Sequence, residues 1–404
     1  MTQNERRILT LCGIGHFVAH FFMLMFPSLA LWAHKDFQLT LPETLNLGFT
    51  MYLFFGIVSL PMGFMADRYG HKRLLVLMFL GLGVSSAAAG FTRSAGWFSF
   101  WLAAVGFFAS IYHPVGIGLI SKTCYNRGRA LGNNGVWGNL GIGLGPLLAG
   151  LGAYYTDWRV VYLVVAGATI LVGLLLWRME ISEQPVEREG ATPPGTSGRH
   201  VGYWVIMLAS MCLLGLCYRG TVVSIPAYFE ERVHFLARLL NWETDLAVSA
   251  SHSFGTTLLV SGIYLFGIFG QMTGGRLADR FDLRFAYLLF HSCALPFMFL
   301  MGLLSDLPLF VVAMGYLFFS LGMQPIENSL VARMTPNHLR SLAYGLKFIL
   351  VLGMGAFSVK VVKWVLTYRE PELVYFIQAG LIATVLLLVS VLYYLSRKES
   401  FRNV

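Results

Sequence analysis

We select six ionisable side chains that lie within long apolar stretches of this sequence, where a charge is costly. These residues are His16, His20, His113, Arg219, Glu327 and Lys347. In apolar surroundings such groups are retained mostly for binding, for proton transfer or for an ion pair. They are therefore the first candidates for a functional site.

The histidines and the arginine suit different tasks. Imidazole titrates near physiological pH, so His20 and His113 are candidate proton carriers. The alternative is that each is only a hydrogen-bonded packing residue. His16 lies one helical turn before His20 and shares its face. Arg219 keeps its charge at any accessible pH and is suited to hold an anionic group of a substrate.

The carboxylate and the amine are expected to form a pair. Counted from the ends of their apolar stretches, Glu327 and Lys347 lie at a similar depth. A neighbouring cation keeps a carboxylate ionised. Two roles stay open: a carboxylate that couples proton movement to transport, or a static ion pair that closes one side. Three polar neighbours complete the candidate set, namely Asn134, Tyr218 and Gln324.

Enzyme chemistry has no support in the sequence. There is no phosphate-binding loop, which argues against ATP-driven transport, and no pattern of catalytic or metal-ligating residues. A metal site made of the three histidines and Glu327 would require all four groups within about 2–2.2 Å of one ion. Their different stretches and depths predict that they do not meet. We therefore expect no enzymatic activity, no cofactor and no metal.

The elements that position these residues are membrane spans. The chain has 404 residues, of which 56% are hydrophobic and 12% charged, whereas about a quarter of a soluble domain is charged. A bilayer requires backbone groups to be paired internally, and apolar runs of about 20 residues without alternation favour helices over barrel strands.

The formal charge of +9 falls in short clusters between the runs. This distribution fits membrane topology and argues against nucleic-acid binding.

Twelve such runs divide the chain into two halves. They lie near residues 8–32, 45–66, 73–92, 96–120, 130–153 and 159–178, and near 203–228, 253–275, 284–304, 308–332, 340–366 and 372–395. We predict an N-terminal six-helix bundle (1–179), a flexible Pro-, Gly- and Ser-containing cytoplasmic linker (180–200) and a C-terminal six-helix bundle (201–404). The excess of Lys and Arg on the side of both termini predicts that both are cytoplasmic.

The two halves also resemble each other in sequence. Gly63, Asp67 and Arg68 recur as Gly275, Asp279 and Arg280 at a constant offset. His20 and Arg219 each stand seven residues before a proline, Pro27 and Pro226, and Arg129 matches Arg340 in the second half. A six-span repeat in parallel orientation is typical of transporters built from two bundles that rock against each other.

The stretch "GFMADRYGHKR", residues 63–73, resembles the loop motif between spans two and three of the major facilitator superfamily. The matching residues are Gly63, Asp67, Arg68, Lys72 and Arg73, and in the second copy Gly275, Asp279, Arg280 and Arg284. The second copy has Asp282 where the first has Gly70. The resemblance covers nearly the whole chain and implies twelve transmembrane helices in two pseudo-symmetric bundles, with spans one, four, seven and ten lining a central cavity. It also implies that the acidic and basic residues of the motif hold the cytoplasmic ends of helices together. The alternative is that the positive charges only keep this loop on the cytoplasmic side.

The stretch "GNNGVWGNLGIGLGPLLAG", residues 132–150, resembles the span-five motif of drug:proton antiporters in the same superfamily. The matching residues are Gly132, Gly141, Gly145, Pro146 and Gly150. Glycines four residues apart let a neighbouring helix approach closely, and a proline bends the helix. The resemblance implies export, whereas ordinary helix packing would explain the glycines without any statement of direction.

A narrower resemblance is to bacterial fosmidomycin-resistance-type exporters. It rests on "GHFVAHFFMLMFPSLALW" in span one and on "YHP" in span four. Those proteins usually carry an acidic residue at the position of His20 and F-H-P-E in span four. Here Val115 follows the proline, so the proton pathway of that subgroup is not fully present.

These patterns predict a proton-coupled secondary transporter of the bacterial inner membrane, which exports a small anionic or amphiphilic organic molecule by alternating access. The first alternative is proton-coupled uptake of a carboxylate-like anion anchored by Arg219. The second is a membrane receptor that does not transport. The expected partners are the lipid bilayer, protons and a small-molecule substrate, with no nucleic acid and with the chain working as a monomer.

Overall fold

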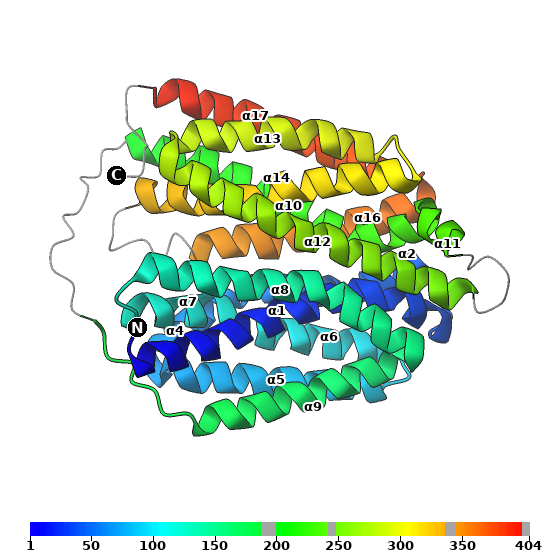
Figure 1. Cartoon of the computed structure of the whole chain (residues 1–404), viewed down its shortest axis with the longest axis horizontal. Helices are drawn as coiled ribbons and strands as arrows, with labels where there is room; N and C mark the ends of the chain where they lie inside the picture. Colours follow the sequence, from blue (N-terminus) through cyan, green and yellow to red (C-terminus); the bar gives the residue numbers. More distant parts are fainter. Residues whose placement is uncertain (187–198, 241–247, 336–344, 398–404) are drawn as a thin grey trace. The chain divides into compact units, whose positions relative to one another are not determined.

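The computed structural model describes residues 1–186, 199–240, 248–335 and 345–397, and within these ranges every regular element is a helix. Contacts define two compact units (Figure 1). Unit 1 comprises Met1–Glu189 and Ala237–Ser261, and unit 2 comprises Gly190–Leu236 and Gly262–Val404. The all-helical membrane fold expected from the sequence is confirmed. The exact bundle boundaries that we expected stay a prediction.

Unit 1 holds the helices of the first half of the chain. They are α1 (Gln3–Asp36), α2 (Leu41–Asn46), α3 (Phe49–Ile57), α4 (Ser59–Tyr69), α5 (His71–Phe91), α6 (Ala95–Ala109), α7 (Tyr112–Thr123), α8 (Arg127–Tyr155), α9 (Trp158–Arg178) and the start of α12 (Val248–Arg280). Helix α1 packs along α8, and α5 packs along α9. In Figure 1 these helices are coloured from blue to green.

Unit 2 holds the helices of the second half. They are α10 (Arg199–Arg232), the rest of α12, α13 (Leu283–Met301), α14 (Asp306–Met334), the π-helical turn η2 (Ile349–Gly353), the 3-10 turn η3 (Met354–Phe357), α16 (Ser358–Tyr368) and α17 (Leu373–Leu395). The short helix α11 (Phe235–Leu239) follows α10 and contains the point where the chain passes between the units. Helix α13 packs on both α14 and α17.

The expected spans correspond to these helices. Within the described residues, eleven spans are long and apolar enough to cross a membrane, and the bent pair Leu41–Ile57 and Ser59–Tyr69 makes a twelfth if it is counted as one span. The two parts of this pair meet at 47°. Pro61 has no N–H to donate to the carbonyl of Ile57, which accounts for the break in the helix.

Glycines let α8 approach α1 closely. A side chain at Gly141 would collide with the carbonyl oxygen of Phe17, and one at Gly145 would lie 3.0 Å from the side chain of Leu24. From the other side, Gly13 leaves room for the ring of Trp137. Two glycines of the span-five motif therefore serve helix packing within unit 1.

The end of the span-five motif meets the first part of α12. The hydroxyl of Ser261 donates to the carbonyl of Gly143 and accepts from the N–H of Leu147, 3.2 Å away. In a regular α-helix Leu147 would donate directly to Gly143. The hydroxyl of Ser261 thus lies between Leu147 and Gly143 of α8, next to Pro146. A side chain inserted into the backbone hydrogen bonds of a helix, like a proline, bends the helix.

A carboxylate from residues 180–186, which follow α9, caps helix α5. Glu183 accepts hydrogen bonds from the backbone N–H groups of His71 (3.0 Å) and Lys72 (2.9 Å), and it lies 3.1 Å from Nδ1 of His71. The first N–H groups of a helix have no partner within it. Gly70, with φ of +93°, sets the sharp turn just before α5.

The second charged motif supplies its own cap instead. Asp282 accepts from the backbone N–H of Arg284 (2.9 Å) and binds its guanidinium through Nε (2.9 Å) and a terminal nitrogen (2.7 Å). Burial raises the pKa of Asp282, but Arg284 lowers it by more, so it lies below the usual range. Arg284 also donates to Oγ of Ser396 after α17 (2.7 Å). In the first motif, which has Gly70, the N–H groups at the start of α5 are bound by Glu183 of the linker. In the second motif, Asp282 stands at that position and binds the N–H of Arg284 itself.

The other charges of the two motifs are more accessible. Asp67, Arg68, Arg73, Asp279 and Arg280 are exposed, and the half-buried Lys72 donates from Nζ to the carbonyl of Trp177 (2.8 Å). Gly63 and Gly275 lie within α4 and α12. The latching role of these residues stays a prediction. Arg340, the repeat partner of Arg129, lies outside the described residues.

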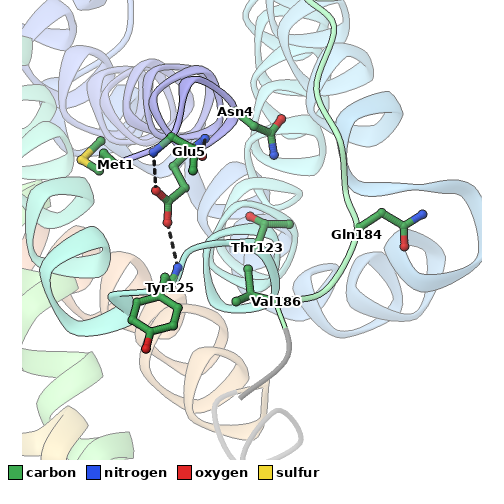
Figure 2. A pocket seen from close by; sticks show the side chains of 8 residues that line it. Met1, Asn4, Glu5, Thr123, Tyr125, Gln184 and Val186 are labelled. Carbon is green, nitrogen blue, oxygen red and sulfur yellow. Dashed lines mark hydrogen bonds between the residues drawn. The ribbon is translucent and has the colours of Figure 1, made fainter. Parts of the chain in front are cut away.

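A pocket of about 600 Å³ lies beside the first residues of α1 (Figure 2). Glu5 stands in its wall and accepts from the backbone N–H groups of Thr2 (2.7 Å) and Tyr125 (2.8 Å). Gln184 and Val186 complete the lining from the far side. Glu5 therefore ties the start of α1 to the connection between α7 and α8.

Replacing Glu183 with Gln is expected to lower thermal stability at neutral pH, because two N–H groups of α5 lose a charged acceptor. Burial raises the pKa of Glu183, but the bonds from Lys72 and His71 lower it by more, so it lies below its ordinary value. Loss of a helix cap costs about 1 kcal/mol. The stabilisation is complete above the unfolded-state pKa of about 4.3 and is lost as the pH falls through the lower, folded-state value.

Tryptophan fluorescence during heating in detergent measures this effect at several pH values. The matched control is Glu180→Gln, because the side chain of Glu180 is exposed. Equal destabilisation by both variants, or a Glu183→Gln effect that is the same at all pH values, would contradict the proposed cap.

Candidate functional site

Three of the candidate residues meet inside unit 1. His16 and His20 come from α1 and His113 comes from α7, and their ring nitrogens lie within 4.8 Å of one another. We expected that the three histidines and Glu327 do not all meet; the three histidines do meet, whereas Glu327 belongs to unit 2. The reason is that α7 begins at Tyr112 and packs against α1, which places His113 beside the half-buried turn of α1 that carries the other two rings.

The state of His16 follows from its hydrogen bond. Its Nδ1 lies 2.8 Å from the backbone carbonyl oxygen of Asn134 in α8. A carbonyl can only accept, so Nδ1 carries a proton, and in the neutral form of the ring the lone pair lies on Nε2. Asn134 in turn accepts at Oδ1 from the hydroxyl of Tyr112 (2.6 Å), and the Tyr112 ring stacks on His16 at 4.6 Å.

Gly138 makes room for this cluster. A Cβ atom at Gly138 would lie 2.5–2.8 Å from three atoms of the His16 ring, far inside normal contact. The absence of a side chain therefore lets the ring lie flat against α8. Gly138 falls within the span-five stretch but was not among the residues we selected, because no property of the sequence distinguishes it from its neighbouring glycines.

The expected pair in unit 2 is present. Nζ of Lys347 lies 2.6 Å from Oε1 of Glu327, and only 7% and 4% of the two side chains are exposed. Lys347, which lies just before η2, also donates to Oδ1 of Asn328 (2.6 Å). The other carboxylate oxygen of Glu327, in α14, accepts from the hydroxyl of Tyr287 in α13 (2.8 Å). Two buried opposite charges are thus joined to two neutral partners.

Sequence reasoning missed one further ionisable residue of this network. His291 in α13 is buried, and its ring packs edge-on against that of Tyr287, with centroids 4.5 Å apart. It lies one helical turn after Tyr287 on the face that meets α14. The rule that selected the other histidines, an ionisable group within an apolar run, would also have selected His291.

Arg219 is almost fully buried in α10, next to the irregular part of span eleven. Arg219 is 2% exposed. A Cβ atom at Gly355 in η3 would lie 3.4 Å from the Cβ atom of Arg219. A side chain at Gly215, one turn earlier, would collide with the carbonyl oxygen of Val351 in η2. Two glycines therefore hold η2 and η3 against α10 at the position of Arg219.

The remaining candidates are placed as follows. Tyr218 is half-buried in α10, and Gln324 in α14 accepts at Oε1 from the side chain of Gln271 (3.4 Å). Of the span-five residues, Gly150 leaves no room for a side chain beside Thr257, whereas Gly132 has no neighbour within 4 Å of its Cβ position. Among the described residues, therefore, none packs so closely on Gly132 that it requires a glycine there.

The two clusters differ in what they can do chemically. The first presents three ring nitrogens, which can bind protons or a cation. The second is a charged pair in apolar surroundings, where neutralising one partner leaves the other unpaired at high cost. Arg219 adds a permanent positive charge suited to an anion.

Comparison with known proteins agrees with this architecture. Residues 12–359 match the family model of the Major Facilitator Superfamily. A solved structure of a bacterial homologue of the human lysosomal transporter Spinster aligns with a TM-score of 0.74 at 13% identity and covers 100% of both chains. At this identity the similarity concerns the fold.

Two curated relatives come from Salmonella typhimurium. The methyl viologen resistance protein SmvA is 32% identical over 216 residues, which are 47% of this chain and 43% of that protein. The membrane sensor protein UhpC is 25% identical over 286 residues, which are 63% of this chain and 62% of that protein. The chain covers less than two thirds of the length of each. From the family match over most of its length, we conclude that the chain belongs to the Major Facilitator Superfamily.

Proposed function

We propose that this protein is a proton-coupled exporter of small anionic or amphiphilic organic molecules that works by alternating access in a bacterial inner membrane. The observation that carries the proposal is the buried pair of Glu327 and Lys347. A carboxylate inside a membrane span is costly, and in transporters such groups commonly carry protons. The excess of Lys and Arg on the side of the termini supports cytoplasmic ends. We take the working form to be a monomer.

Proton binding at Glu327 would change the local interactions in a defined way. The neutral carboxyl no longer holds the ammonium of Lys347, which then depends on Oδ1 of Asn328. The π-helical turn η2 begins two residues after Lys347. Such turns interrupt the regular ladder and are frequent at functional sites. The segment that carries Lys347 is therefore a suitable element to change position with the proton.

Direction and substrate class rest on other features. The span-five stretch resembles that of drug:proton antiporters, and SmvA is named for resistance to methyl viologen, which supports export. Arg219 supports a substrate with an anionic group, because its charge cannot be removed by pH. The same arginine would also suit uptake of a carboxylate-like anion, which remains the alternative direction.

A second candidate function is that of a sensor without transport. It is favoured by the similarity to UhpC, a protein named as a membrane sensor. A sensor would bind its ligand in liposomes without moving it or protons. Flux measured together with binding therefore separates the two functions.

Glu327→Gln is expected to abolish transport driven by a pH gradient, because the amide cannot exchange a proton. The double variant Glu327→Gln/Lys347→Gln removes both charges, so it avoids the cost of about 3–5 kcal/mol for leaving one buried charge alone. We expect it to keep substrate exchange across liposomes but not gradient-driven accumulation. Both are measured with radiolabelled substrate and an internal pH dye.

The control for this experiment is Glu231→Gln, an exposed position at the end of α10. If the double variant accumulates substrate as well as wild type does, Glu327 and Lys347 form a static pair and the proton is carried elsewhere. If the wild type binds substrate but neither exchanges nor accumulates it, the sensor function is favoured.

Arg219→Lys is expected to weaken binding of organic anions by about 10- to 100-fold, because lysine keeps the charge but loses the planar guanidinium. Neutral amphiphiles should bind as before. Ligand-induced shifts of thermal unfolding across a panel of organic anions and neutral amphiphiles measure both classes. An equal loss for both classes would indicate that Arg219 supports the packing of η3 and does not contact substrate.

A further inference from the structure

The three histidines of unit 1 have the spacing of ligands around one metal ion. The ring centroids of His16, His20 and His113 are separated by 4.9, 5.5 and 5.2 Å. A zinc–nitrogen bond is about 2.0–2.1 Å, and a ring centroid lies about 1.1 Å beyond its nitrogen, so three imidazoles at tetrahedral angles have centroids about 5.2 Å apart. The three observed centroid distances are close to this value. One nitrogen of each ring lies within 4.8 Å of the others, so small ring movements would bring them to the spacing of about 3.3 Å that a tetrahedral ion requires.

The protonation state of His16 also fits a ligand. Its Nδ1–H donates to the backbone carbonyl of Asn134, so in the neutral ring Nε2 is the nitrogen that can bind a metal ion. Metal-bound histidines usually donate their other N–H to a carbonyl or a carboxylate, which fixes the tautomer and the ring orientation. The side chain of Asn134 is itself fixed by the hydroxyl of Tyr112. The outer partners of a metal site are therefore in place for this ring.

The surroundings hold the rings in a rigid, largely apolar cage. His16 lies between the Tyr112 ring, which stacks on it at an interplanar angle of 16°, and the bare backbone of Gly138. Phe55 of α3 contacts both His113 and His20, with centroids 5.5 and 6.3 Å away. A rigid apolar shell limits water access and favours a single coordination geometry.

We propose that His16, His20 and His113 bind one divalent transition-metal ion of the zinc type. Imidazole nitrogens suit zinc, copper, nickel and cobalt, whereas magnesium and calcium prefer oxygen ligands. Three protein ligands leave a fourth position open to water or to an anionic group. The site lies in unit 1 and includes neither Glu327 nor Lys347, the pair that carries the proposed function. Its failure and the failure of the proposed function are therefore distinguishable.

The test is a titration of the full-length protein in detergent with Co²⁺, using a purification tag that contains no histidine. We expect a single Co²⁺ per chain with the visible absorption of a four-coordinate ion, and displacement of that ion by Zn²⁺. His20→Gln and His113→Gln are each expected to weaken binding by about 100-fold or more, since loss of an outer-shell partner alone costs about 10- to 100-fold. Gly138→Ala should weaken it less, by displacing the ring of His16.

Two controls separate binding from folding. His291→Gln removes a buried histidine of unit 2 and should leave the Co²⁺ titration unchanged. Each variant is also compared with wild type by its unfolding temperature without metal. Absence of four-coordinate Co²⁺ in the wild type, or equal binding by wild type and folded His20→Gln, would overturn the proposal.

Discussion

Both units depend on helix pairs that approach until backbone meets backbone, a contact that only glycine permits. In unit 1 this contact joins Gly141 to the carbonyl of Phe17, and in unit 2 it joins Gly215 to that of Val351. Lipid tails are as apolar as side chains, so helices in a bilayer associate mainly through such close packing and through polar contacts. His16 lies beside the first crossing and Arg219 beside the second. Their positions are therefore set by the helix axes and not by flexible loops.

The polar groups buried in the two units follow one rule but form two kinds of network. In apolar surroundings an unsatisfied donor or acceptor is costly, so a fully bonded network favours one arrangement over others. The network around His16 is built from neutral groups and presents ring nitrogens. That around Glu327 holds opposite charges that one proton would change. A division of tasks between cation binding and proton coupling is consistent with this difference.

The sequence predicted the spans and the Glu327–Lys347 pair because both depend on distance along a helix, which residue number measures directly. It did not predict the contact of His113 with His20, since that depends on which helices are neighbours. The hydrogen bond from His16 to the carbonyl of Asn134 could not be predicted for another reason: every residue has a backbone carbonyl, so the sequence does not distinguish this one. Glu183 was missed because its surroundings resemble a flexible linker, although it caps α5. His291 met the criterion we used and was simply overlooked.

The π-helical turn η2 has a consequence for how related sequences should be aligned. A π-helical turn holds one residue more than an α-helical turn, so the side chains on either side of it differ in phase by about 100° from those of an unbroken helix. A relative that lacks this extra residue would present a different side chain towards its counterpart of Glu327. A one-residue gap near Ile349–Gly353 in an alignment would then mean that the relative has lost the π-helical turn. In such a relative, the cation that pairs with the counterpart of Glu327 should be sought one position before or after Lys347.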